Sequence, residues 1–130
     1  MSVPLSHEHL ILRAEIKKPL TSIDAAIIFI QKLVDSIDMK IANLPDGAKN
    51  PIAWYCEDEG NRGLTSTAII ETSHIAMHIW DECVPAVLQL DVYSCAKIDP
   101  YKIKDSIEIF EPISIESKFI DRNEGVNVIF

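Results

Sequence analysis

Residues 65–95 read TSTAIIETSHIAMHIWDECVPAVLQLDVYSC, and their pattern decides the predicted fold. Residues 64–71 and 73–80 are rich in β-branched and apolar side chains, which is typical of buried strands. They predict either one long bent strand or two strands. Residues 88–95 alternate between apolar and polar positions, which predicts a further strand with Cys95 on its polar face. The centre of the chain is therefore predicted to be β-sheet.

The flanking segments predict two helices and more strands. Apolar residues recur three and four positions apart between Ile23 and Ile37, after a possible N-cap at Thr21-Ser22, which predicts an amphipathic helix. Asp99-Pro100 is a second helix start. Strands are predicted at 9–16, 39–44, 51–56, 113–120 and 126–130. This order predicts an α+β two-layer sandwich in one domain over residues 1–130, with a mostly antiparallel sheet and both helices on one face.

Composition excludes several classes of function. The net charge is −8 and the 12 Lys and Arg residues are scattered, which argues against nucleic acid as a partner. No apolar run approaches the ~20 residues of a membrane span, and residues 1–16 do not resemble a signal peptide. The 3 cysteines show no C-x-x-C spacing, so we expect a reducing, cytoplasmic location without disulfides or structural zinc.

Reactive side chains gather in the central stretch, and two ordinary kinds of site explain them poorly. His74 and His78 have the four-residue spacing of a helical zinc pair, but on a strand they lie ~13 Å apart, too far to share one ion. Ser73, His78 and Asp91 are available for a hydrolase triad, but the G-x-S-x-G turn that exposes such a serine is absent.

A third chemistry uses Ser73 against its own backbone. The Ser73 hydroxyl attacks the Thr72 carbonyl to form an ester, and elimination of that ester leaves an N-terminal pyruvoyl group. The ketone of this group can form a Schiff base with an amine substrate and act as an electron sink. The reaction needs a strained peptide, a group near the oxyanion and a base, for which Thr65 and His78 are candidates.

The segment SHIAMHIWDE, residues 73–82, followed by QLDVYSCA, residues 89–96, resembles the bacterial and archaeal S-adenosylmethionine decarboxylases. The signature of that family combines a processing serine, two histidines, a Trp, a Glu, and a downstream Asp-aromatic-Ser/Thr-Cys strand. The matching residues here are Ser73, His74, His78, Trp80, Glu82, Asp91, Tyr93, Ser94 and Cys95. Gly63-Leu64-Thr65 is similar to the Gly-x-Ser segment of the family.

The resemblance implies self-cleavage between Thr72 and Ser73, with a covalent pyruvoyl cofactor made from Ser73 and no metal. It implies that His78 assists cleavage by proton transfer and that Thr65 stabilises the oxyanion. Cys95 would protonate the substrate carbon after carbon dioxide leaves. Glu82 would hold the hydroxyls of a bound nucleoside, and Trp80 would also contact the substrate. The resemblance also implies an α/β sandwich fold, a homodimer and a role in polyamine biosynthesis.

Several departures from the family pattern bear on the substrate, among them about two extra residues between Trp80 and Asp91. Thr72 stands where the family has Glu, and Asp81 stands where it has Pro. Residues 59–62, Glu-Gly-Asn-Arg, replace an aromatic that stacks on adenine, so Trp54, Tyr55 or Trp80 would have to substitute. Two alternatives therefore stay open: a decarboxylase of another amino acid such as arginine or ornithine, and an unprocessed relative that binds a small ligand or regulates a partner.

Overall fold

A computed structural model describes residues 6–130, and in this part of the chain seven strands form one antiparallel sheet. The strands are β1 (Glu8–Ile16), β2 (Ile52–Cys56), β3 (Gly63–Ile70), β4 (Ser73–Trp80), β5 (Ala86–Ser94), β6 (Pro112–Asp121) and β7 (Asn127–Val128). The helices are α1 (Ile23–Ser36) and α2 (Pro100–Ser106), and short 3₁₀ turns cover η1 (Pro45–Gly47) and η2 (Ile107–Phe110). The order across the sheet is β2-β3-β4-β5-β1-β6-β7.

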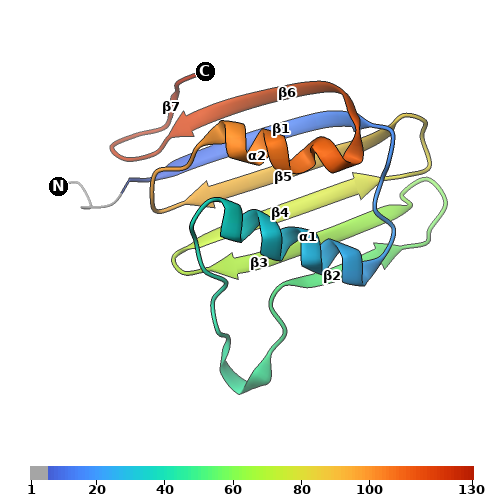
Figure 1. Ribbon diagram of the computed structural model, residues 1–130, viewed down its shortest axis with the longest axis horizontal. Coiled ribbons are helices and arrows are strands. Elements are labelled where there is room, and N and C mark those ends of the chain that lie inside the picture. Colours follow the sequence, from blue (N-terminus) through green and yellow to red (C-terminus); the bar gives the residue numbers. More distant parts are fainter. Residues whose placement is uncertain (1–5) are drawn as a thin grey trace.

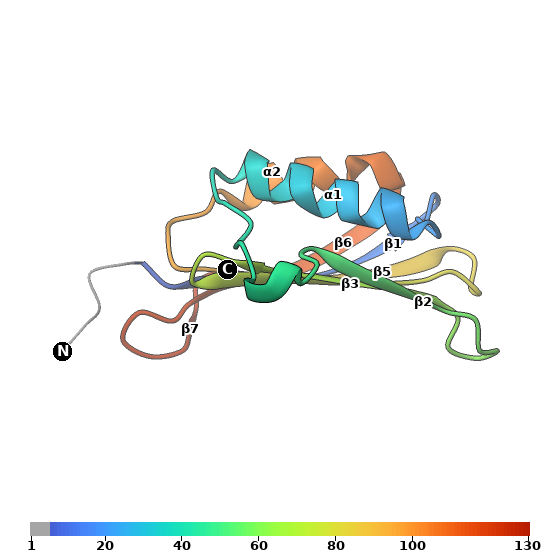
Figure 2. The same cartoon turned by 90° about the horizontal axis from the view of Figure 1, so that it is seen from below.

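Both helices lie on the same face of the sheet, as predicted (Figure 1). Seen from the side, residues 6–130 form two layers, and in this part of the chain the other face of the sheet carries no helix (Figure 2). We call this second face the open face. It carries alternate residues of each strand, among them Thr65, His74, His78, Asp91 and Ile11. The α+β sandwich read from the sequence is therefore confirmed.

The core fills the space between the helices and the sheet. Alternation along each strand sends one set of apolar side chains under the helices, where they are removed from water. Phe29 of α1 packs on Phe110 of η2 with 4.9 Å between ring centroids, which joins the two helical segments. The sheet contributes Leu10, Leu12, Leu64, Ile75, Met77, Leu88 and Leu90, all at most 2% exposed.

The predicted first helix is present, but its buried stripe is rotated slightly. The Ser22 side chain caps it by accepting a hydrogen bond from the Ala25 amide at 3.2 Å. Ile23, which begins the predicted apolar spacing, is 42% exposed, whereas Phe29, which lies off that spacing (Ile23, Ala26, Ile27, Ile30), is buried. The reason is that Phe29 faces the second helical segment as well as the sheet.

The strand predicted at 39–44 is wrong, since only an isolated bridge between Ile41 and Ile70 forms there. β2 pairs with β3 only up to Thr67, so the last part of the β3 edge needs other partners. The Asn50 side chain supplies them: its Nδ2 donates to Ala42 O (2.9 Å) and Ile69 O (2.7 Å), and its Oδ1 accepts from Ile69 N (3.0 Å). A side-chain amide thus stands in for a strand.

Residues 64–80 form two strands and not one bent strand. A two-residue loop, Glu71-Thr72, connects them. β3 and β4 pair along their whole length, from Gly63 opposite Trp80 to Ile70 opposite Ser73. Within residues 6–130, no helix is long and apolar enough to cross a bilayer.

Candidate functional site

The predicted cleavage site lies in the tight turn between β3 and β4. The pairing of His74 with Tyr93, continued by two residues, places Thr72 opposite Cys95 just beyond the end of β5. The Ser73 hydroxyl oxygen accepts a hydrogen bond from the Cys95 amide at 2.9 Å. Thr72 Oγ1 lies 2.8 Å from Cys95 Sγ and donates towards it. Cys95 is therefore in direct contact with Ser73 and Thr72, although it lies 22 and 23 positions further along the chain.

Thr72 has an unfavourable backbone conformation. Its φ is +56°, in the left-handed region that favours glycine and asparagine. For a β-branched residue this conformation costs roughly 1–2 kcal/mol. The strain sits directly before Ser73, at the peptide bond that the sequence predicts to be cleaved.

The thiol of Cys95 is activated by its neighbours. Hydrogen bonding from the Ser73 hydroxyl, and next from Thr72, lowers the pKa of the Cys95 thiol from its model-compound value of 9.0. Partial burial and the Glu71 carboxylate oppose this shift by disfavouring the thiolate. Cys95 Sγ also lies 3.6 Å from the Glu71 carbonyl oxygen, to which the protonated thiol donates. The sulfur therefore has polar partners in both protonation states.

A second group of predicted residues lies on the open face. Thr65 of β3 and His78 of β4 are directly paired, and Thr65 Oγ1 is 3.0 Å from His78 Nδ1. The His78 ring stacks on Trp80 with 5.7 Å between centroids. Trp80 Nε1 in turn donates to Asn61 Oδ1 at 3.2 Å. The hydroxyl, the imidazole and the indole form one connected row.

Glu82 follows this row at the end of the sheet opposite to the Thr72 turn. Both of its carboxylate oxygens accept from the Gly60 amide, at 3.0 Å each. This contact ties the loop after β4 to the loop before β3. Glu82 is therefore close in sequence and structure to Trp80, but not to Ser73.

The two groups are separate within one chain. Ser73 and His78 are five residues apart on one strand, roughly 16 Å at ~3.3 Å per residue. The Ser73 side chain is buried on the helix side, whereas His78 is half-buried on the open face. Asp91 pairs with Ala76 and not with His78, so the alternative hydrolase triad is not assembled either.

Two further side chains, His9 and Arg122, contact His74 or Tyr93 on the open face, and no role was predicted for either. His9 of β1 packs against Tyr93 and His74 on the open face, with ring centroids 6.1 and 6.4 Å away. Burial, more than any other cause, lowers the pKa of His9; the positive charge of Arg122 adds to this, while Asp91 opposes it. Arg122 lies over the Tyr93 ring at 4.8 Å from its centroid. The register across β1, β4 and β5 brings His9, His74 and Tyr93 together, and Arg122 joins them from directly after β6, so no local pattern signals the group.

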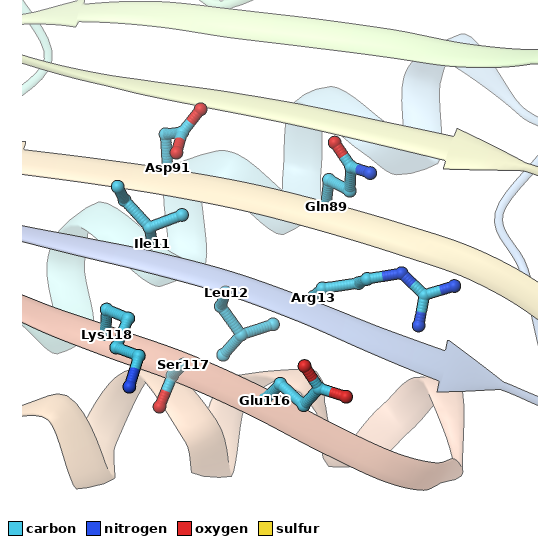
Figure 3. Close-up of a pocket in the computed structure, with 8 residues that line it drawn as sticks. All are labelled: Ile11, Leu12, Arg13, Gln89, Asp91, Glu116, Ser117 and Lys118. Atoms are coloured by element: carbon cyan, nitrogen blue, oxygen red, sulfur yellow. The ribbon is translucent and has the colours of Figure 1, made fainter.

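A shallow depression of about 330 Å³ lies elsewhere on the open face, over β5, β1 and β6 (Figure 3). Ile11 lines it together with charged side chains of both signs. The polar lining side chains that project from the open face are Arg13, Gln89, Asp91, Glu116 and Lys118. None of the predicted catalytic residues lines it, so it is distinct from both groups described above.

Comparisons with known proteins identify a family and a related fold. The family model for S-adenosylmethionine decarboxylase matches residues 16–123, which is most of the chain. The crystal structure of the adenosylmethionine decarboxylase from Aquifex aeolicus superposes with a TM-score of 0.63 at 18% sequence identity, covering 93% of each chain. A search of curated proteins returned no match. At this identity the structural likeness speaks for the fold, and the match over residues 16–123 speaks for the family.

Proposed function

The chain belongs to the S-adenosylmethionine decarboxylase family, and from this premise we propose that it is a pyruvoyl-dependent decarboxylase of S-adenosylmethionine that cleaves itself between Thr72 and Ser73. The observation that carries the proposal is the turn in which the Ser73 hydroxyl, the strained Thr72 backbone and the Cys95 thiol meet. Packing alone gives no reason for this combination. Ser73, Thr72 and Cys95 suit the formation of the pyruvoyl group on which the family depends.

Self-cleavage would proceed in three balanced steps. Ser73 Oγ attacks the Thr72 carbonyl carbon, and the peptide C–N bond breaks to give an ester and a free Ser73 amine. A base removes the Ser73 Cα proton, and the Cβ–Oγ bond breaks to release Thr72 as a carboxylate. Water then replaces the nitrogen on the remaining Cα, and ammonia leaves. Relief of the left-handed Thr72 conformation favours the first step, because the strained peptide bond is lost.

The pyruvoyl group supplies an electron-withdrawing carbonyl for the substrate amine. The residues of this chain have simpler tasks. Cys95, held at the turn, would deliver a proton to the substrate carbon as carbon dioxide departs. Trp80 and Glu82 would bind the remainder of the substrate at the other end of the row that contains His78.

The separation of the two groups supports a homodimer as the working enzyme. Thr65 and His78 are too far from Ser73 to act on it within one chain. All three residues lie on the same sheet, so a partner that packs against that sheet could bring its own Thr65 and His78 to the site. The open face also exposes large apolar side chains: Ile11, Ile52, Trp54 and Ile69 are 42–63% exposed. A second copy packed on this face would cover them and would bring His78 of one chain towards the turn at the end of the sheet that carries the Thr72–Ser73 bond of the other. We also place the protein in the cytoplasm, in line with its free cysteines.

Intact-protein mass spectrometry tests self-cleavage directly. We expect the purified protein to give two fragments, residues 1–72 and 73–130, the second lacking the Ser73 amine. Ser73→Ala should give one full-length folded chain. A wild-type protein that stays intact after prolonged incubation would refute self-processing. Fragments that end at Thr72 in Ser73→Ala would refute the serine mechanism.

Co-expression of two inactive variants tests the shared site. In a mixed dimer of Ser73→Ala and His78→Ala chains, one site combines an intact Ser73 with an intact His78. We expect cleavage of the His78→Ala chain only, which differently sized tags distinguish. If each chain held a complete site, neither variant would be cut. The matched control is a Ser73→Ala chain paired with itself.

Release of labelled carbon dioxide identifies the substrate. We expect release from S-adenosylmethionine and none from arginine or ornithine under the same conditions. If carbon dioxide is released from arginine or ornithine alone, that amino acid is the substrate, and the proposed pyruvoyl mechanism still applies. This distinction is needed because Glu-Gly-Asn-Arg at 59–62 takes the place of an aromatic side chain.

One observation favours the second candidate, an unprocessed protein that binds a small ligand. The depression around Ile11 presents cationic and anionic side chains within about 330 Å³, which suits a small molecule carrying both charges. Calorimetric titration of S-adenosylmethionine into the intact Ser73→Ala chain tests it, with Arg13→Gln as the variant. The second candidate would be supported if the wild-type protein never cleaves itself and if Arg13→Gln abolishes binding of S-adenosylmethionine.

A further inference from the structure

Thr72 stands in the turn at the position where the family has Glu, and its contacts indicate a specific task. We propose that Thr72 is a positioning residue whose hydroxyl holds the Cys95 sulfur beside Ser73 and stabilises its thiolate form. The consequence for catalysis rests on the proposed function. The effect on Cys95 does not, because it belongs to the intact chain.

The geometry gives the Thr72 hydroxyl two acceptors. Its Oγ1 lies 2.8 Å from Cys95 Sγ and 2.7 Å from the Glu71 carbonyl oxygen. A single proton cannot serve both acceptors fully. A thiolate is a much better acceptor than a thiol, so loss of the Cys95 proton turns the hydroxyl towards sulfur. When Cys95 is protonated, its own S–H donates to the Glu71 oxygen, 3.6 Å away.

The strained backbone indicates that this contact matters in the native turn. Glycine or asparagine would adopt a φ of +56° at lower cost than threonine. Neither offers a hydroxyl to the sulfur. The side chain that is poorly suited to the turn is therefore well suited to Cys95.

The charged groups around the turn do not replace this contact. Glu71 is in the turn itself, and its carboxylate raises the pKa of Cys95. Lys40, whose carbonyl accepts from the Glu71 amide, approaches from the loop after α1, and Lys97 follows Cys95 by two residues. The Ser73 and Thr72 hydroxyls oppose the effect of Glu71 and lower the pKa of the Cys95 thiol, and the Ser73 hydroxyl has the larger effect of the two. A glutamate at position 72 would add a second negative charge beside the sulfur and remove one of these hydroxyls.

The test measures the Cys95 thiol without relying on enzyme activity. All variants are made in a Ser73→Ala chain, which cannot cleave and in which Thr72 is the remaining side-chain hydroxyl at the sulfur. Iodoacetamide alkylation of Cys95 is followed by peptide mass spectrometry from pH 6 to 10, and the midpoint of the rate profile is compared. Thr72→Val removes the hydroxyl and keeps the side-chain shape. Thr72→Ser keeps the hydroxyl and is the matched control.

We expect Thr72→Val to raise the midpoint by about half to one pH unit and Thr72→Ser to leave it within about 0.2 unit. Thr72→Gly also removes the hydroxyl, and because glycine tolerates positive φ it provides the same measurement if the valine chain folds poorly. An upward shift in both hydroxyl-free variants supports the proposal. Midpoints equal to that of the parent in Val and Gly would overturn it, whatever the wild-type chain does at the Thr72–Ser73 bond.

Discussion

Replacing Gly63 by alanine should strongly destabilise the sheet beside the candidate site. Gly63 begins β3 and pairs with Trp80 of β4. A Cβ at this position would lie 2.1 Å from the Ile79 carbonyl oxygen and 3.0 Å from both Ile79 C and Trp80 Cα. All three are backbone atoms, so no side-chain rotation can relieve the contact. The strands themselves would have to move apart.

The size of the effect follows from two opposed contributions. Glycine to alanine in a strand ordinarily stabilises by roughly 0.5–1 kcal/mol, because the unfolded chain loses freedom. Forcing an extra carbon into a packed site costs typically 1–3 kcal/mol, and a contact with backbone at this distance lies at or above the upper end. We expect the free energy of unfolding to fall by about 2–3 kcal/mol after the gain from alanine is subtracted. The displaced strand would also disturb the pairing of Thr65 with His78, two residues further along β3.

Urea unfolding followed by circular dichroism measures this loss in the Ser73→Ala chain, where cleavage cannot interfere. Gly125→Ala is the matched control, because the nearest atom to its Cβ would be Asn127 Nδ2 at 3.4 Å, the end of a flexible side chain. We expect that control to change stability by less than about 0.5 kcal/mol. A Gly63→Ala chain as stable as Gly125→Ala would show that the close approach of β3 and β4 is not as described.

Three other changes test separate parts of the structure. Phe110→Ala should cost about 3–5 kcal/mol in the same unfolding assay, since the ring is 1% exposed and packs on Phe29; a loss under about 1 kcal/mol would contradict the interlocked helical layer. Asn50→Ala should cost about 1–3 kcal/mol and speed hydrogen exchange of the Ile69 amide, and unchanged exchange would show that this amide has another partner. Because the pKa of His9 is lowered in the folded state, folding favours its neutral form. Its contribution to stability is complete above the unfolded pKa of 6.5 and is lost as pH falls through the folded value. His9→Gln should therefore flatten the fall of melting temperature between pH 7.5 and 5, and parallel curves would refute this role.

Most of the secondary structure was predictable because it depends on local patterns. The apolar spacing of residues 23–37 and the alternation of residues 88–95 each imply one element whatever lies elsewhere in the chain. Prediction failed at 39–44, where the apolar composition of a strand is present but only a bridge forms, and the Asn50 side chain takes part of the hydrogen bonding that a longer strand would have made. A side chain that replaces backbone pairing leaves no periodic signal.

The candidate site was predictable only as a set of residue types. The motif from Ser73 to Cys95 identified the reactive residues and a family, which the match over residues 16–123 confirms. Their roles stay predictions. The sequence did not indicate that Thr72 adopts a left-handed conformation or that His9 packs against His74 and Tyr93, because the contacts of His9 depend on register between distant strands.

The sequence by itself determined most of the segments that form strands and helices, 39–44 excepted, since hydrophobic periodicity is a property of neighbouring residues. Only the tertiary structure decided which reactive groups meet. Ser73 and Cys95 are 22 residues apart yet share a hydrogen bond, whereas Ser73 and His78, five residues apart, lie on opposite faces of one strand. The physical reason is that an extended strand moves neighbours apart by ~3.3 Å per residue and alternates their faces, while antiparallel pairing brings distant residues into contact. The contact between Thr72 and Cys95 is a product of that pairing.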